Sequence, residues 1–249
     1  MFKWVVRFCL IAAVATGTPA VSGDSQAVTL VAGDQVEIRG DLYALDDDEG
    51  RAAPMVLLFH QAGSNRGEYV DIAERLNDNG FHALAIDQRS GGKRWGFDNE
   101  TVAKLGKSAD YLAALPDLEA ALKWKSDSGY KGKTLVWGSS YSAALVFLLA
   151  AEHRQIDGVL SFSPGEYLGS RSDEVRQAAK LVRQPVLVLT PENERDRAAL
   201  VFDVIPSENK KLVIPELAVH GSSMLVPERN EGAAKIWPEV LAFLEPFGD

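Results

Sequence analysis

The sequence has little cysteine and no concentrated positive charge. Its 249 residues include one cysteine, and 26 lysines and arginines stand against 35 aspartates and glutamates, which gives a formal net charge of −9. A single cysteine excludes a framework of disulfide bonds. Because no basic stripe is present, we do not expect a surface that binds nucleic acid. With 46% hydrophobic and 24% charged residues, the composition is that of an ordinary globular domain.

The first 23 residues have the pattern of a secretory signal peptide. A basic flank precedes the apolar run 8–15, and small residues follow it. The run is short for a membrane span, and small residues such as Ala20 predict cleavage between positions 20 and 27. The alternative is an uncleaved N-terminal anchor. Cleavage would remove Cys9, so we expect a secreted or periplasmic protein with no thiolate nucleophile, no cysteine metal ligand and no stable membrane span.

The rest of the chain, residues 24–249, shows the periodicity of a single α/β domain. Alternating apolar residues over 27–45, on either side of Gly33, predict an antiparallel hairpin. Six short, continuously apolar runs then alternate with helical stretches, a pattern typical of buried parallel strands. The predicted strands are 55–59, 83–86, 135–137, 158–162, 186–189 and 212–214, and the predicted helices are 66–79, 111–125, 141–152, 172–183, 194–204 and 232–244. We therefore expect a mostly parallel eight-stranded sheet with an N-terminal antiparallel hairpin and helices on both faces.

Two segments between these elements are rich in charge. The acidic run 46–50 is predicted to be a solvated turn rather than a metal site, because consecutive carboxylates repel one another. Segment 88–110 also contains several glycines and Trp95, and it follows a predicted parallel strand. Loops at the carboxyl ends of such strands surround the binding crevice, so we predict an irregular rim loop there.

The strongest local pattern is KTLVWGSSYSAA at residues 133–144, where a strand runs directly into a helix through small residues. Gly138 and Ser142 lie two positions before and after Ser140, the spacing that a nucleophile elbow requires because its turn is tight. Ser140 is therefore the candidate nucleophile, above the N-terminus of a helix that favours developing negative charge. The alternative is an ordinary strand-to-helix turn with capping serines, since Ser142 stands where the G-x-S-x-G pattern has glycine.

A serine nucleophile needs a base and an acid, and candidates occur in the expected later loops. His220 follows the last predicted strand, while Glu192, Glu194 and Asp196 follow the strand before it. Spacing does not choose among the three carboxylates. No metal-ligand spacing and no glycine-rich phosphate loop stands out, so no metal or nucleotide cofactor is expected.

With these segments the chain resembles small, capless α/β-hydrolases, such as dienelactone hydrolases and related esterases. Beside the elbow, the resemblance rests on MVLLFHQAG at 55–63, AIDQRSGG at 85–92 and DLEAALKW at 117–124. It implies that Ser140 is the nucleophile and His220 the base. It also implies that Glu194 is the acid, with Glu192 as the second choice.

The resemblance further implies an oxyanion hole formed by the backbone N–H groups of Ala62 and Tyr141. His60 would organise the oxyanion loop rather than act as the base, because it precedes the elbow in the chain. Gln61 stands where the family has glycine. Gln61 is therefore a candidate substrate contact, and Trp95 is another because it lies in the predicted rim loop.

These features predict a serine hydrolase that cleaves a small or medium ester, or a related acyl bond, through an acyl-enzyme. The alternative is a non-catalytic binding protein that has kept the α/β-hydrolase fold, because a fold does not guarantee activity. An oxidoreductase with a dinucleotide cofactor is disfavoured, because no G-x-G-x-x-G follows the first strand.

Overall fold

The computed structural model describes residues 25–46, 51–169 and 173–248. The predicted signal peptide, residues 1–23, and positions 47–50 of the acidic run lie outside these ranges. Across the described ranges, no helix is long and apolar enough to cross a membrane.

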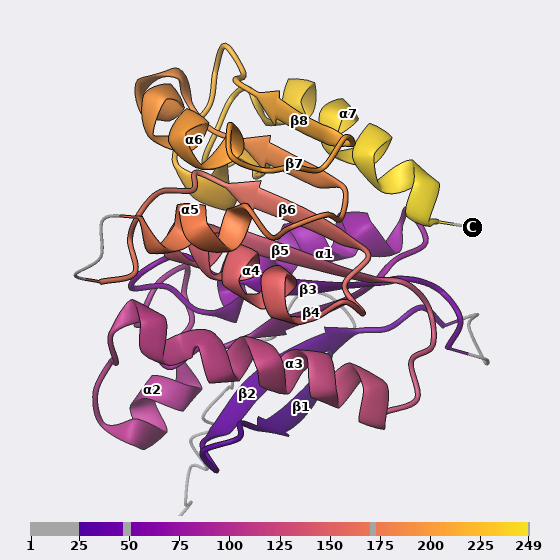
Figure 1. Ribbon diagram of the computed structural model, residues 1–249. Helices are drawn as coiled ribbons and strands as arrows, with labels where there is room; N and C mark the ends of the chain where they lie inside the picture. The colour runs from indigo at the N-terminus through magenta and orange to yellow at the C-terminus, as the bar shows by residue number, and fades with distance from the viewer. Residues whose placement is uncertain (1–24, 47–50, 170–172, 249) are drawn as a thin grey trace, which may run out of the picture.

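One eight-stranded sheet runs through the molecule in the order β1-β2-β4-β3-β5-β6-β7-β8 (Figure 1). The strands are β1 (Gln26–Val31), β2 (Glu37–Tyr43), β3 (Met55–Phe59), β4 (His82–Ile86), β5 (Thr134–Ser139), β6 (Gly158–Phe162), β7 (Val186–Leu189) and β8 (Lys210–Val213). The pairs β1–β2 and β2–β4 are antiparallel, and all the other pairs are parallel. This confirms the predicted mostly parallel sheet with an N-terminal antiparallel hairpin.

Helices cover both faces of the sheet, as predicted. The α-helices are α1 (Val70–Asn77), α2 (Glu100–Leu105), α3 (Leu115–Asp127), α4 (Tyr141–Glu152), α5 (Glu174–Ala179), α6 (Arg195–Phe202) and α7 (Ala233–Leu244). Short 3₁₀ turns are η1 (Arg66–Tyr69), η2 (Tyr111–Ala114), η3 (Glu192–Glu194), η4 (Gly221–Leu225) and η5 (Glu245–Phe247). Helices α3 to α6 pack on one face, and α1 and α7 pack on the other (Figure 1).

The strand sequences explain these two layers. In β3, Leu57 belongs to the core beneath α3 to α6, whereas its neighbours Val56 and Leu58 belong to the core beneath α1 and α7. Side chains alternate across a strand, so an unbroken apolar run supplies both cores. The loops at the carboxyl ends of the parallel strands are thereby held at one edge of a rigid sheet.

The prediction of an irregular loop over residues 88–110 is wrong in one part, because the segment contains helix α2. The Asn99 side chain accepts a hydrogen bond from the N–H of Val102, and Gly106 ends the helix with a φ of 78°. These are ordinary helix start and stop signals, an N-cap asparagine and a terminal glycine. The helix has only 6 residues, too few to show an apolar period.

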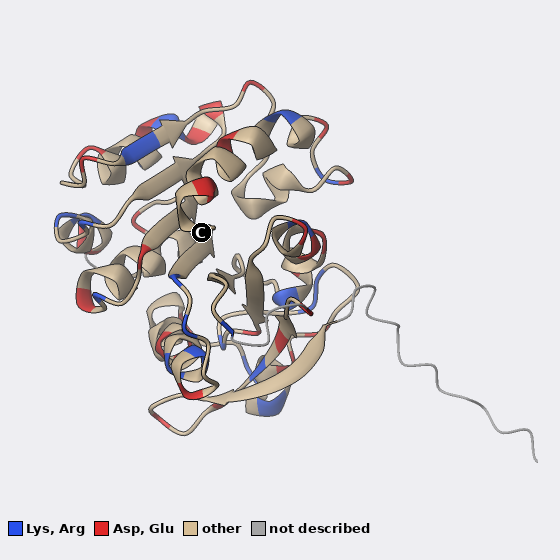
Figure 2. Ribbon diagram, turned by 90° about the vertical axis from the view of Figure 1, so that its right-hand side faces the viewer, with Lys and Arg blue, Asp and Glu red and all other residues tan. Residues whose placement is uncertain are grey.

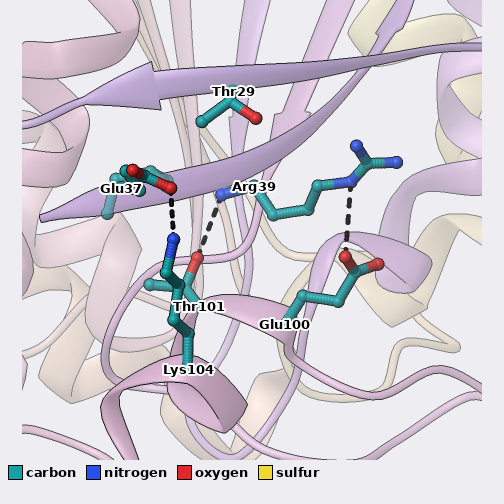
Figure 3. A pocket seen from close by; sticks show the side chains of 7 residues that line it. Thr29, Glu37, Arg39, Glu100, Thr101 and Lys104 are labelled. Carbon is teal, nitrogen blue, oxygen red and sulfur yellow. Dashed lines mark hydrogen bonds and ion pairs between the residues drawn. The ribbon is translucent and has the colours of Figure 1, made fainter.

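Helix α2 is fastened to the sheet by paired charges (Figure 3). The N–H of Arg39 donates to the Thr101 hydroxyl at 3.0 Å, Lys104 pairs with Glu37, and Arg39 Nε lies 3.7 Å from Glu100 Oε2. These residues line a pocket of about 190 Å³ between the N-terminal hairpin and α2. Since its charged groups pair with one another, this pocket attaches the rim segment to β2.

The bounds of the other elements differ less from the predicted ranges. Strand β8 begins and ends before the predicted 212–214, because an edge strand that starts with two lysines is not marked by an apolar run. Helix α5 is shorter than the predicted 172–183. Lysine and arginine segments are interspersed with aspartate and glutamate segments along the described ribbon (Figure 2), in keeping with the mixed charge of the sequence.

Candidate active site

The junction between β5 and α4 has the geometry of a nucleophile elbow. Ser140, the one residue between the two elements, has φ 59° and ψ −118°. Its N–H donates to the carbonyl oxygen of Phe162 in β6 at 2.9 Å. A residue with a side chain adopts a positive φ only where the surrounding structure enforces it, and such strain gathers at functional sites.

The small residues around Ser140 have different reasons to be small. A Cβ atom on Gly138 would lie 2.2 Å from the carbonyl oxygen of Ser142, so no side chain fits there. The Ser142 hydroxyl donates to the His60 carbonyl oxygen at 2.6 Å and accepts from Gln88 Nε2 at 2.7 Å. Position 142 therefore tolerates serine in place of glycine, because both roles of the buried hydroxyl are satisfied.

His220 and Glu194 are brought together. His220 Nδ1 lies 2.7 Å from Glu194 Oε1, and the Glu194 side chain is 10% exposed. Glu192, by contrast, is exposed and pairs with Arg195, and Asp196 is exposed in the first turn of α6. Of the three candidate acids, Glu194 is the one that contacts the histidine.

The loop that carries His220 packs directly against the elbow. The N–H of Gly221 donates to the Ser163 hydroxyl at 3.0 Å, and the N–H of Ser222 donates to the Ser139 hydroxyl at 2.9 Å. A Cβ atom on Gly221 would lie 2.4 Å from Ser139 Oγ and 4.0 Å from Ser140 N. The backbone next to His220 thus packs against Ser139, the residue before the nucleophile candidate.

His60 organises the loop after β3. It is fully buried, its Nδ1 lies 2.8 Å from the Gln61 carbonyl oxygen, and its Nε2 accepts from the N–H of Gln88 at 3.0 Å. Burial lowers the pKa of His60 to about 4. With both ring nitrogens engaged inside the protein, His60 is a structural residue and not the base.

Two backbone N–H groups stand at the positions predicted for an oxyanion hole, one in the loop after β3 and one at the start of α4. Throughout the described ranges, the N–H of Ala62 has no acceptor. The N–H of Tyr141 is the first in α4, where a helix leaves its N–H groups without intrahelical partners. An oxyanion hole uses backbone N–H groups that have no partner in the protein.

The two candidate substrate contacts are engaged by protein groups. Gln61 is 7% exposed, and its Nε2 donates to Glu68 Oε1 at 3.2 Å. The Trp95 indole donates to the Ser64 hydroxyl at 3.0 Å, and the guanidinium groups of Arg94 and Arg229 lie over its ring, 4.5 and 3.7 Å from the ring centre. Trp95 thus joins the rim segment to the oxyanion loop, and Gln61 does the same by accepting from Arg94 Nη1 at 3.4 Å.

Glu68 is a residue of the site that sequence reasoning missed. Its fully buried carboxylate accepts from the N–H of Gln61 at 2.8 Å and from the Ser139 hydroxyl at 2.7 Å. It therefore joins the oxyanion loop to the residue before the nucleophile. A glutamate in a charged turn carries no signal of burial, because its partners come from distant segments. No group of His, Cys, Asp and Glu that could hold a metal ion occurs among residues 25–46, 51–169 and 173–248.

A family comparison matches this chain to known hydrolases. The family model described as serine aminopeptidase, S33, matches residues 50–203, a span that contains Ser140 and Glu194. No curated protein matches the sequence.

Solved structures share the fold. An esterase from Pyrococcus furiosus superposes with a TM-score of 0.69 at 18% identity, covering 92% of this chain and 95% of its own. A dienelactone hydrolase from Anabaena variabilis gives a TM-score of 0.68 at 20% identity, covering 90% and 98%. The ferulic acid complex of Est1E from Butyrivibrio proteoclasticus has 17% identity and covers 89% of this chain and 99% of that one.

Proposed function

The chain belongs to the serine aminopeptidase, S33, family of α/β-hydrolases, and from that premise we propose that it is a serine hydrolase that cleaves esters or related acyl bonds. In this proposal Ser140 is the nucleophile, His220 is the general base and Glu194 is the acid that orients it. The products are an alcohol and a carboxylic acid when the substrate is an ester.

One observation carries the proposal. His220 Nδ1 lies 2.7 Å from Glu194 Oε1, and the loop that carries His220 packs against Ser139, next to the strained backbone of Ser140. Since Nδ1 is occupied, the other ring nitrogen, Nε2, is left to accept a proton from the serine. Serine, histidine and acid in this chain order are the arrangement of an α/β-hydrolase triad.

The reaction follows from these positions. Ser140 Oγ attacks the substrate carbonyl carbon while its proton passes to His220, and the Glu194 carboxylate stabilises the imidazolium that forms. The N–H groups of Ala62 and Tyr141 donate to the developing oxyanion, above the N-terminus of α4. The imidazolium protonates the leaving group, and water then cleaves the acyl-enzyme by the same steps in reverse.

The substrates in this proposal are small or medium esters. The connection from β6 to α5 spans only residues 163–173, so no lid domain is inserted there. The fold neighbours include an esterase and a dienelactone hydrolase, which supports an ester over a peptide bond. We further propose that the protein is exported through its N-terminal segment.

Labelling with a fluorophosphonate probe, followed by peptide mapping, tests the proposal. The folded protein should be labelled in the peptide that contains Ser140, and Ser140→Ala should abolish labelling and turnover of simple esters. Ser126→Ala, which removes an exposed serine of α3, is the matched control and should be labelled normally. A folded protein without labelling at neutral pH would instead support a non-catalytic binding protein.

Two glutamate-to-glutamine substitutions test which of Glu194 and Glu192 is the acid. Glu194→Gln should lower kcat by about a hundredfold to ten-thousandfold, because the amide stabilises the imidazolium poorly and favours the wrong histidine tautomer. Glu192→Gln should retain normal activity, since Glu192 pairs only with Arg195 at the surface. The reverse result would move the acid to Glu192.

A further inference from the structure

A groove of about 520 Å³ lies between the 3₁₀ turn before α3 and the loop after β6. Its walls include Tyr111 and Leu112 on one side, and Tyr167 and Leu168 on the other. Tyr111 and Leu112 are 40% and 38% exposed, so this apolar surface is open to solvent. A volume of this size is typical of small-molecule sites.

Both walls of the groove touch the catalytic loops. The Tyr111 ring stacks on the Tyr141 ring at 4.6 Å with an interplanar angle of 21°, and Tyr141 is the residue after the nucleophile. On the other wall, the Tyr167 hydroxyl donates to the carbonyl oxygen of Ser163 at 3.1 Å. The Ser163 hydroxyl in turn accepts from the N–H of Gly221, the residue after His220.

The polar atoms of the second wall are already satisfied. The Tyr167 hydroxyl also accepts from Arg197 Nη1 at 3.1 Å, so both its donor and an acceptor site are used inside the protein. What Tyr167 offers to a ligand is therefore its ring. One face of Tyr111 is covered by Tyr141, and the same ring lines the groove. Two aromatic rings and two leucines favour a flat apolar group that can stack.

We propose that this groove, the Tyr111–Tyr167 groove, binds an aromatic ring of the substrate, so that the hydrolase prefers esters with an aromatic group. The inference rests on the proposed function, because the ring belongs to an ester that Ser140 attacks, and Tyr111 of the groove stacks on Tyr141, the residue after Ser140. The ring belongs either to the acyl portion or to the alcohol portion of the ester.

Two matched pairs of esters show whether the ring belongs to the acyl portion or to the alcohol portion. Methyl benzoate against methyl cyclohexanecarboxylate tests the acyl portion, and benzyl acetate against cyclohexylmethyl acetate tests the alcohol portion. Within each pair the size of the group is similar, so the ratio of kcat/KM reports its aromatic character. In one of the two pairs the aromatic ester should be favoured by about threefold to tenfold, the range expected from one or two ring contacts.

Conservative variants identify the rings responsible. Tyr111→Leu and Tyr167→Leu should each reduce the aromatic ratio, and the double variant should bring it to about one. Tyr111→Phe and Tyr167→Phe keep the ring and lose only the hydroxyl, so they should retain the ratio. A ratio that stays high in the double leucine variant would overturn the assignment of these two residues.

Labelling of the unmodified protein distinguishes a failure of the groove assignment from a failure of the proposed function. If Ser140 is labelled by the fluorophosphonate but neither ester pair shows an aromatic preference, the Tyr111–Tyr167 groove is not a ring site and the proposed function stands. If Ser140 is not labelled in the folded protein, the proposed function itself fails. Labelling together with an aromatic ratio that depends on both rings supports the inference.

Discussion

Ser140 combines a reactive position with a backbone conformation that disfavours any side chain. Its φ of 59° and ψ of −118° lie in a region that glycine occupies freely. We therefore expect Ser140→Gly to be more stable than Ser140→Ala by about 1 kcal/mol, because only alanine keeps the clash of a Cβ atom. Urea unfolding of the two inactive variants measures this difference. Equal stabilities would mean that the elbow relaxes when the serine is removed.

His60 makes the stability of the fold depend on pH. Burial lowers its pKa from 6.5 to about 4. Between these values the unfolded chain binds a proton at this position and the folded chain does not, so the free energy of unfolding decreases as the pH falls below about 6.5. The His60 contribution lost between pH 7 and pH 5 is about 2 kcal/mol.

The measurement is urea unfolding at both pH values for the unmodified protein and for His60→Gln. The variant has no imidazole to titrate, so its stability should change less between pH 7 and pH 5, although it is less stable at pH 7. An unchanged pH dependence would show that the pKa of His60 is the same in the folded and the unfolded chain.

At the scale of elements, the patterns that one segment carries by itself were predictable. The bounds of β3, β6, β7 and α4 match the predicted ranges, because continuous apolar runs and a strand-to-helix junction are local signals. Helix α2 was missed because it is short and lies in a charged, glycine-containing segment. A short helix that is held by caps and by ion pairs to β2 leaves little trace in the apolar pattern.

The residues of the site also divide into those that a local pattern locates and those that depend on contacts between distant segments. Ser140 and His220 were located by their places after particular strands, which the order of the α/β sheet determines. The choice between Glu192 and Glu194 depended on which side chain the turn η3 directs to His220, and three clustered carboxylates do not reveal this. Glu68 depended entirely on contacts between distant segments, so no local pattern pointed to it.

Glu68 couples two elements of the site, and its removal should affect both stability and catalysis. In Glu68→Gln one carboxylate oxygen becomes an NH₂ group, which donates and does not accept, so either the N–H of Gln61 or the Ser139 hydroxyl loses its acceptor. We expect the free energy of unfolding to fall by about 1–3 kcal/mol. We also expect kcat to fall by roughly tenfold to a hundredfold, because the oxyanion loop shifts relative to the elbow.

Urea unfolding and ester hydrolysis measure these two effects of Glu68→Gln. The matched control is Glu231→Gln, which changes an exposed glutamate and should leave both quantities unchanged. A loss of stability with normal kcat would show that Glu68 supports the fold without positioning the oxyanion loop.

At the scale of the whole molecule, the sheet assembles one site from four distant segments. Ser140, His220, Glu194 and the loop at Ala62 follow β5, β8, β7 and β3, whose carboxyl ends share one edge of the sheet. Two apolar cores hold that edge from opposite faces. Loops on such a scaffold can differ between relatives while the sheet and its two cores persist, which explains how the fold is shared at 18% identity.

Export makes a prediction about the whole chain. The single cysteine, Cys9, lies within the predicted signal peptide, so the exported protein should contain no thiol. Expression of the full chain in a bacterium with a periplasm, followed by intact-mass analysis, should give an N-terminus created by cleavage between residues 20 and 27. Iodoacetamide should add no mass under denaturing conditions. A membrane-bound chain that retains an alkylated Cys9 would instead support an uncleaved N-terminal anchor.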